Sequence, residues 1–314
     1  MHTEPDPSLN RHSVRLLISL ALLVMTLFPL AGCSSQEDEA PPIETATVSD
    51  ETIRVSIAGI ITPKETYSQY SELLDYISRR TGHPTVLEQT GTYMGVNDSL
   101  AREEIDVAFM CSGGYEEASH HIGIKPLVAP VINGEAVYHA YIIVRSNSGI
   151  TSFDQLRGRR FAFTDPLSLT GTIYPSSRAI ESGNSPDEFF SDFIFTYNHD
   201  NSIKALQENV VDGASVDSII FDSLKANHPE SVEGLSIIET SKPFGSPPIV
   251  TRRGMAEEER RQLLDVLTGM DEDPWGKEIL TAMGIDRFIA VDNSHYDAVR
   301  KLEGKLSSGP GGSG

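Results

Sequence analysis

Apolar strand-like runs alternate with amphipathic helical patterns from residue 53 onward. In the first part, large apolar residues between Tyr67 and Ile77 recur at helical spacing, and the pattern breaks at Thr81-Gly82. Strands are expected at 53–59, 85–88 and 105–110, and helices at 67–77, 94–102 and 113–120. Such alternation with short connections predicts a mostly parallel sheet with helices on both faces.

A second alternating set follows a long extended run at 137–145. It comprises strands at 161–164, 193–197 and 214–216, with helices at 171–181 and 202–210. The last part, 255–306, has three helical patterns with breaks near 270–274 and 284–293. We therefore expect an α/β protein with two lobes, joined by extended segments near 137–146 and 246–252. Ligands of open α/β sheets bind at the carboxyl ends of strands, so the cleft between the lobes is the expected site.

The N-terminus has the pattern of a secretory signal. Basic residues at 11–15 precede an apolar run, Leu16–Leu30, which ends in Leu-Ala-Gly-Cys at Cys33. This tetrad resembles the bacterial lipoprotein box, in which the cysteine is lipidated, and the alternative is a single membrane-anchor helix. We expect a signal peptide at 1–32, an acidic tether at 33–50 and a flexible tail at 307–314.

Charge and cysteine content narrow the possible functions. The formal net charge of −20, from 45 acids and 25 bases, excludes nucleic acid as a partner. A small anion remains possible, because oriented N–H and O–H groups can hold one without net positive charge. Cys111 is the only cysteine besides Cys33, so no disulfide can form within the fold.

The segment Thr164–Thr172 places hydroxyl groups at a predicted helix start. Ser168 and Thr170, together with the free N–H groups of the first helical turn, could converge on one oxyanion. The alternative is an ordinary capped helix in which Ser168 only satisfies the backbone. Asp165 is expected to form the turn, since its carboxylate would repel an anion.

Other helix starts carry further candidate donors. Tyr93 could donate its phenol O–H and His199 a ring N–H, although a surface tyrosine and a solvated cap are the alternatives. The adjacent His120 and His121 point about 100° apart on a helix and do not form a metal pair. We expect neither a metal nor a cofactor.

Several ordered motifs resemble the phosphate/phosphite/phosphonate-binding proteins of ABC transporters. They are Thr-Tyr-Met-Gly, Ile-Asp-Val-Ala-Phe, Val-Tyr-His-Ala-Tyr-Ile-Ile-Val, Ser-Phe-Asp-Gln-Leu-Arg-Gly-Arg, Asp-Pro-Leu-Ser-Leu-Thr-Gly and Asn-His-Asp, within residues 52–255. The resemblance implies a two-lobed type II periplasmic-binding-protein fold and no enzymatic activity. It also implies a small oxyanion ligand, a permease partner and an extracytoplasmic location. One lobe would comprise 51–140 and 249–306, and the other 141–248.

The resemblance also implies ligand-binding roles for particular residues. The matching positions are Tyr93, Tyr138, Ser168, Leu169, Thr170, Gly171 and His199. Leu169 replaces a Thr or Ser of many members, so only its backbone N–H could help. Where aminophosphonate-binding members have carboxylates, this chain has Ile219 and Pro247, which implies a ligand without an amine: phosphite, phosphate or a small alkylphosphonate.

Three further residues are expected near the cleft: Cys111, Ser112 and Asp217. Cys111 leaves two alternative functions open, a sensor-binding protein and a secreted hydrolase. Some members of this family pass their signal to sensor histidine kinases, and one branch binds arsenite through a cysteine. The resemblance and Cys111 therefore leave open a sensor-binding protein for an oxyanion such as arsenite. A secreted hydrolase would need Cys111 as nucleophile and His139 or His199 as base, and no sequence signature supports one.

Overall fold

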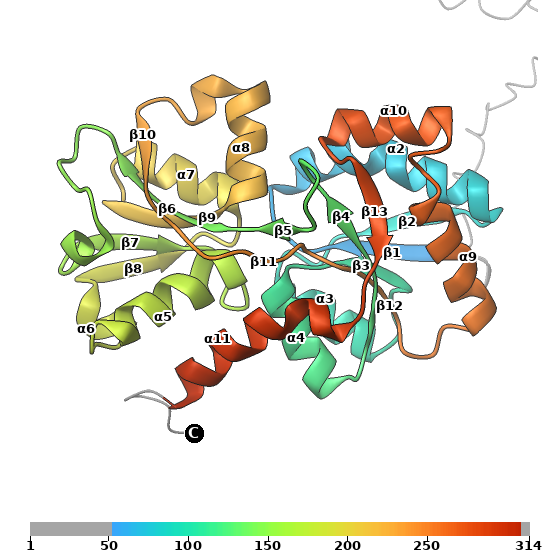
Figure 1. Cartoon of the computed structure of the whole chain (residues 1–314), viewed down its shortest axis with the longest axis horizontal. Coiled ribbons are helices and arrows are strands. Elements are labelled where there is room, and N and C mark those ends of the chain that lie inside the picture. Colours follow the sequence, from blue (N-terminus) through green and yellow to red (C-terminus); the bar gives the residue numbers. More distant parts are fainter. Residues whose placement is uncertain (1–51, 309–314) are drawn as a thin grey trace, which may run out of the picture. The chain divides into compact units, whose positions relative to one another are not determined.

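The computed structural model describes residues 52–308, which contain two main mixed sheets covered by helices (Figure 1). The first sheet has the strand order β13-β4-β12-β3-β1-β2. Its strands are β1 (Ile53–Ile57), β2 (Thr85–Glu88), β3 (Val107–Phe109), β4 (Pro126–Val131), β12 (Ile249–Thr251) and β13 (Arg287–Ala290). We call the part built on this sheet the first lobe.

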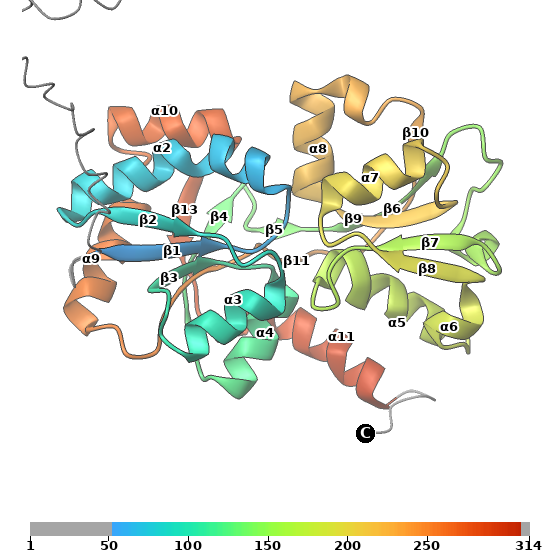
Figure 2. The same cartoon turned by 180° about the vertical axis from the view of Figure 1, so that it is seen from behind.

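Helices cover both faces of the first sheet because its central strands are apolar on both sides. Val107 and Phe109 of β3 face one core, whereas Ala108 between them faces the other. The first core is covered by α2 (Pro63–Thr81), α9 (Glu257–Thr268) and α10 (Pro274–Met283), and the second by α3 (Tyr93–Ala101) and α4 (Ser112–His121). Figure 2 shows α2 and α10 on one side of the sheet and α3 and α4 on the other.

The second lobe is built on a five-stranded sheet with the order β10-β6-β9-β7-β8. Its strands are β6 (Ala140–Arg145), β7 (Arg160–Phe163), β8 (Asp192–Phe195), β9 (Gly213–Asp217) and β10 (Leu235–Thr240). Its helices are α5 (Tyr174–Glu181), α6 (Pro186–Phe189), α7 (His199–Gln207), α8 (Ser218–Asn227), the 3-10 helices η2 (Phe153–Leu156) and η4 (Pro229–Ser231), and the π-helix η3 (Leu169–Ile173). Both lobes belong to one compact unit of the chain.

Two antiparallel segments connect the lobes. They are β5 (Val137–Tyr138) and β11 (Phe244–Gly245), which pair with each other (Figure 1). Near them, η5 (Asn293–Tyr296) leads into α11 (Asp297–Ser308), which packs against α4 of the first lobe and α5 of the second. The connecting region is therefore braced by the C-terminal helix.

The two-lobed α/β architecture expected from the sequence is confirmed. Strands β1, β2 and β3 are mutually parallel, as are β7, β8 and β9. In contrast, β12 and β13 in the first sheet and β6 in the second run antiparallel to their neighbours, so both sheets are mixed. The sequence patterns did not predict β4, β10, β11 or β13.

Some sequence predictions fall outside the described residues. The signal peptide at 1–32, the tether at 33–50 and Cys33 lie there, and so does the predicted tail beyond Ser308, the last residue of α11. Within residues 52–308, no helix combines the length and apolarity that a membrane span requires.

Candidate functional site

The loop before η3 of the second lobe lies directly against helix starts of the first lobe. A Cβ atom added to Gly113, near the start of α4, would lie 2.4 Å from the carbonyl oxygen of Leu167. Only a glycine allows the two backbones to approach so closely. The hydroxyl-bearing turn and the first-lobe helix starts are thereby brought together.

Asp165 forms both the turn and a contact between the lobes. Its Oδ1 accepts the N–H of Leu167 at 2.9 Å, as expected of a turn former, and its Oδ2 accepts the N–H of Tyr93 at 3.0 Å. Asp165 therefore caps α3 from the opposite lobe. Burial raises the pKa of its carboxyl, and the two backbone hydrogen bonds oppose that increase.

Ser168 and Thr170 are both fully buried at the start of η3, and they have different hydrogen bonds. The Oγ of Ser168 accepts the N–H of Gly171 at 3.1 Å, so the hydroxyl proton remains free to donate. The Oγ1 of Thr170 is buried without a protein partner. Because buried polar groups normally have partners, this hydroxyl is a candidate ligand contact.

Gly171 and Leu169, the other two predicted ligand-binding residues of this turn, pack against protein atoms. A Cβ atom on Gly171 would lie 1.6 Å from Oγ1 of Thr164, so a side chain cannot fit there. The Leu169 N–H is directed at the sulfur of Cys111. In this structure the N–H groups of Leu169 and Gly171 thus contact protein atoms.

His199, the first residue of α7, has one ring nitrogen fixed by the backbone. Its Nδ1 lies 3.2 Å from the N–H of Asp217 and accepts it, which leaves the hydrogen of the neutral ring on Nε2. Nε2 is buried without a partner, and burial lowers the pKa of the ring to about 3. His199 therefore presents a neutral N–H donor with a defined tautomer.

Strand β9 positions the unpartnered donors of Thr170 and His199. The hydroxyl of Ser215 donates to the carbonyl oxygen of Thr170, whereas the Asp217 N–H binds His199. Ser215 is the middle residue of β9 and Asp217 the last, and ligands of open α/β sheets bind at the carboxyl ends of the strands. The geometry accordingly brings the Thr170 and His199 donors to one end of the sheet.

Tyr93 and Tyr138 complete the buried polar cluster, each with 1% of its surface exposed. The hydroxyl of Tyr93 contacts the side chain of Ser168, and that of Tyr138 lies 3.7 Å from the sulfur of Cys111. Burial, followed by the charges of neighbouring groups, raises the pKa of both phenols well above the usual range. Both hydroxyls consequently remain protonated donors.

Ser112 and Cys111 lie at the start of α4. The Ser112 hydroxyl donates to the carbonyl oxygen of Gly245 at 2.8 Å and so ties α4 to the connecting strand β11. Burial raises the pKa of the Cys111 thiol, although N–H groups of Leu169 and Gly113 oppose the shift. A raised pKa disfavours the thiolate that a nucleophilic mechanism requires.

Asp217 is a buried residue next to His199, which its position in the sequence did not indicate. It ends β9 and caps α8, where its Oδ1 accepts the N–H of Ile219 at 2.7 Å. Asp217 is only 3% exposed, and burial raises the pKa of its carboxyl to about 7. A strand ending in Asp-Ser before a helix was the only sequence signal for this residue.

A small apolar cavity of about 90 Å³ adjoins Asp217. It is lined by Ile60, Tyr70, Phe109, Met110, Pro130, Ile132, Asp217, Ile219, Ile220, Ser223, Pro247, Pro248, Ile249, Met283, Ile285 and Phe288. Asp217 is the single charged residue in this lining. The cavity also contains Ile219 and Pro247, the two positions at which the sequence lacks a carboxylate.

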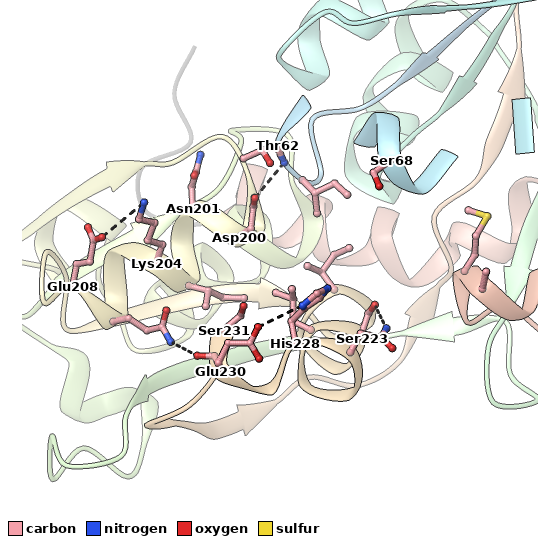
Figure 3. Close-up of a pocket in the computed structure, with 18 of the residues that line it drawn as sticks. Thr62, Ser68, Asp200, Asn201, Lys204, Glu208, Ser223, His228, Glu230 and Ser231 are labelled. Atoms are coloured by element: carbon pink, nitrogen blue, oxygen red, sulfur yellow. Dashed lines mark hydrogen bonds and ion pairs between the residues drawn. The ribbon is translucent and has the colours of Figure 1, made fainter. Parts of the chain in front are cut away.

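A larger cavity of about 970 Å³ lies among α2, α7, α8 and α10 (Figure 3). Its lining includes Glu72, Asp200, Glu208 and Glu230 but only one lysine, Lys204. Figure 3 shows the Lys204–Glu208 pair and the contact of Asp200 with the Thr62 N–H, which is 3.3 Å long. None of the predicted ligand-binding residues lines this acidic cavity, so it does not suit an oxyanion.

The neighbouring histidines His120 and His121 have separate carboxylate partners. Their Nε2 atoms lie 3.8 Å from Glu116 and 3.2 Å from Glu117, each one helical turn away. Across residues 52–308, no group of three or more histidine, cysteine or acidic side chains is arranged to hold a metal ion.

The cluster as a whole offers uncharged donors in a water-poor setting. Tyr93, Tyr138, Ser168, Thr170 and His199 are each at most 1% exposed, and all are neutral O–H or N–H donors. Hydrogen bonds to an ionised acceptor are stronger than neutral ones, particularly where water is excluded. This arrangement can hold a small anion without a cationic side chain.

Comparison with known proteins gives a family match over most of the chain. The model described as "ABC transporter, phosphonate, periplasmic substrate-binding protein" matches residues 56–296. The phosphonates-binding periplasmic protein of Escherichia coli strain K12 is 24% identical over 241 residues, covering 74% of this chain and 70% of that protein. The phosphate-import protein PhnD of Mycolicibacterium smegmatis is 26% identical over 202 residues, covering 61% and 63%, respectively.

A solved structure shows the same fold. PhnD1 of Prochlorococcus marinus, in complex with methylphosphonate, superposes with a TM-score of 0.75 at 14% identity. The superposition covers 82% of this chain and 98% of that one.

Proposed function

The chain belongs to the phosphonate-binding family of periplasmic substrate-binding proteins of ABC transporters, and we propose that it captures phosphite, phosphate or a small alkylphosphonate for a permease. The observation that carries this proposal is the ring of His199. Its tautomer is fixed by Asp217, and its buried Nε2–H has no protein partner. A buried donor held in this way costs free energy unless a ligand acceptor meets it.

The second unpartnered donor supports the same position for the ligand. Thr170 Oγ1 is buried near the end of β9, and the Ser168 hydroxyl beside it still has its proton to donate. Tyr93 and Tyr138 add two phenol donors. Together these groups match the several oxygens of a tetrahedral oxyanion.

We further propose that the ligand lacks an amine. Ile219 and Pro247 line the small apolar cavity beside Asp217, and an ammonium group placed there would have a single carboxyl partner. Burying a charge with so few partners is costly, whereas a methyl group would be accommodated favourably. The methylphosphonate bound by the Prochlorococcus structure and the phosphate import of the mycobacterial relative are consistent with this ligand class.

The family acts outside the cytoplasm, and we propose that a lipid on Cys33 retains this chain at the membrane surface. The support is the apolar run ending in Leu-Ala-Gly-Cys, followed by an acidic segment without large apolar clusters. That segment would separate the fold from the lipid and leave the cleft accessible to ligand and permease.

Thermal unfolding of the purified full-length protein in detergent tests the ligand class. Phosphite, phosphate or methylphosphonate should raise the midpoint, because a ligand at 100 times its Kd stabilises the native state by about 2.7 kcal/mol. An equal concentration of 2-aminoethylphosphonate should raise it much less. Calorimetry showing tightest binding to the aminophosphonate would contradict the amine-free assignment, and no stabilisation by any of the four would contradict oxyanion binding.

A further inference from the structure

The acidic cavity among α2, α7, α8 and α10 is a groove that both lobes line (Figure 3). The first lobe contributes Thr62 and Ser68, and the second contributes Asp200, Ser223 and others. Its volume of about 970 Å³ lies at the upper end of the range for small-molecule pockets, about 300–1,000 Å³. The groove therefore has room for a segment of a partner, and it is separate from the candidate oxyanion site.

The floor of the groove is apolar. Ile220 and Leu224 of α8 and Met283 of α10 are only partly buried there, and Ile203 and Ile279 are buried beside them. Apolar surface with a polar rim is typical of protein–protein contact sites, and an amphipathic segment binds such a groove through its apolar face. The shape and the floor thus favour a peptide segment of this kind.

The rim of the groove is acidic. Its carboxylates come from both lobes and are Glu72, Asp200, Glu208 and Glu230. The basic side chains are Lys204, which lies 3.9 Å from Glu208, and His228, which lies 3.5 Å from Glu230. In the part of the chain that the structure describes, no group of three or more such side chains is arranged to hold a metal ion. The rim therefore suits a partner that carries several positive charges.

One wall of the groove contains contacts between the lobes. Oδ2 of Asp200 in α7 accepts the N–H of Thr62, the residue before α2, at 3.3 Å (Figure 3). Close by, the side-chain amide of Asn198 donates to the carbonyl oxygens of Gly59 and Ile61, and Ile61 lines the groove. Separation of the lobes would break these contacts and widen the groove. A segment that fits the groove can thus touch both lobes only while they are closed.

Charge excludes three occupants of the groove. Residues 34–50 of this chain include five acids and no lysine or arginine, so they would be repelled by the rim. A second copy of the chain brings a net charge of −20, and an anionic lipid surface is negative as well. The family to which the chain belongs serves ABC transporters, so a permease is the partner that remains.

We propose that this groove is the docking site for a basic, amphipathic extracytoplasmic segment of the permease. The apolar face of the segment lies on the floor, and its lysine or arginine side chains meet the carboxylates of the rim. Because both lobes line the groove, docking depends on their closed arrangement, so the permease recognises the closed protein. The inference rests on the proposed function, since it names the surface through which the permease receives the ligand.

Photo-cross-linking in intact cells that produce the full chain tests this docking site. p-Benzoylphenylalanine introduced at Asn227, an exposed lining residue at the end of α8, should cross-link to a membrane subunit of an ABC transporter, identified by mass spectrometry. Lys225 lies on the same helix, is also exposed and does not line the groove. The photoreactive group at Lys225 should give little of this product.

Charge-reversal variants test the acidic rim. Glu72→Lys/Glu230→Lys reverses one exposed rim acid on each lobe and should lower the cross-link yield from Asn227 at least about fivefold, because like charges then face each other. Asp98→Lys/Asp154→Lys reverses one exposed acid on each lobe outside the groove, with the same change in net charge, and should keep the yield. Calorimetry should give both variants the parent's affinity for methylphosphonate, because none of these acids belongs to the donor cluster.

The outcomes distinguish the docking site from the function on which it rests. Cross-links from Asn227 to a second copy of this chain, to a sensor kinase or to any other protein would overturn the assignment, as would equal yields from the two charge-reversal variants. Calorimetric binding of spermidine to the parent, lost in Glu72→Lys/Glu230→Lys, would assign the groove to a small polycation instead. If the parent bound no oxyanion, the proposed ligand would be wrong, whereas the cross-links would still decide the partner of the groove.

Discussion

His199 and Thr170 of the candidate site are each oriented by a residue from another part of the chain. The Asp217 N–H fixes His199, and the Ser215 hydroxyl holds the carbonyl of Thr170. The donor groups that remain free are side-chain atoms, whereas the contacts that orient them involve mostly the backbone. Side-chain substitutions at the donors should therefore alter ligand affinity more than folding.

Removing the two hydroxyls of the η3 start tests this directly. Thr170→Val is nearly isosteric and removes an O–H without a protein partner, whereas Ser168→Ala also removes the cap of Gly171 at about 1 kcal/mol of stability. Each neutral donor to a charged oxygen contributes about 1.5–3 kcal/mol, so the double variant should bind methylphosphonate at least about tenfold more weakly by calorimetry.

Asp165→Asn is the matched comparison for that double variant. Asparagine retains one oxygen that can accept the Leu167 N–H and form the turn, although it loses the second oxygen, which accepts the Tyr93 N–H. Because no ligand donor is removed, ligand affinity should fall far less than in the double variant. Parent-like binding by the Ser168→Ala/Thr170→Val protein would show that the cleft is not built on this helix start.

Sequence patterns could identify residues whose role follows from local position. Ser168 and His199 stand at helix starts after strands, and this location alone directs their donors toward a strand end. The importance of Asp217 could not be predicted in this way. Tyr70, Tyr93 and Cys111 lie within range of its charge, and only the packing of two lobes brings them there.

At the scale of elements, α11 fastens the two lobes at their connection. Arg300 Nη1 lies 2.7 Å from Oε1 of the fully buried Glu116 in α4, and Lys305 Nζ lies 3.4 Å from Glu181 in α5. Before the helix, the Tyr296 hydroxyl donates to the carbonyl of Ser246 at 3.1 Å. The C-terminal segment thus contacts the first lobe, the second lobe and the segment that connects them.

The two ion pairs of α11 should differ in their contribution to stability. Arg300→Met leaves the Glu116 carboxylate buried and without its guanidinium, which should cost about 3 kcal/mol in the free energy of unfolding measured with urea. Adding Glu116→Gln should restore part of this loss. Lys305→Met, at a side chain that is 66% exposed, should cost less than about 0.5 kcal/mol. Equal effects of the two single variants would contradict this difference in burial.

Element prediction succeeded where periodicity was regular and failed at atypical strands. The strand–helix pairs before residue 121 follow apolar runs with clear helix breaks. In contrast, β4 has the sequence PLVAPV, whose two prolines argue against a strand, although it lies between β12 and β13. Strand β13 has only four residues and pairs with β4, a partner distant in sequence, which no local pattern could reveal.

At the scale of the molecule, the lobes are closed on each other through hydrogen bonds that involve no ligand. The backbone N–H of His199 donates to the Ile60 carbonyl at 3.0 Å, and the side-chain amide of Asn198 donates to the Gly59 carbonyl at 2.9 Å. The backbone and side chain of adjacent second-lobe residues thus bind one short segment of the first lobe.

Replacing the proposed lipid attachment point should separate localisation from binding. Cys33→Ser should release the mature protein from the membrane fraction, as measured by ultracentrifugation and immunoblotting. Its affinity for methylphosphonate should equal that of the parent, because the donors lie between residues 93 and 199. If the variant stayed with the membranes after signal cleavage, the anchor would lie elsewhere.

The cap that Asp165 provides to α3 from across the cleft has a consequence for the time scale of ligand release. A bound anion enclosed by both lobes can leave only after they separate, and separation breaks the Asp165–Tyr93 contact together with those of His199 and Asn198. The residence time of the anion would then be governed by how often the lobes open, even where its own hydrogen bonds are weak. A permease that pulls the lobes apart would release its cargo by breaking contacts that never touch the ligand.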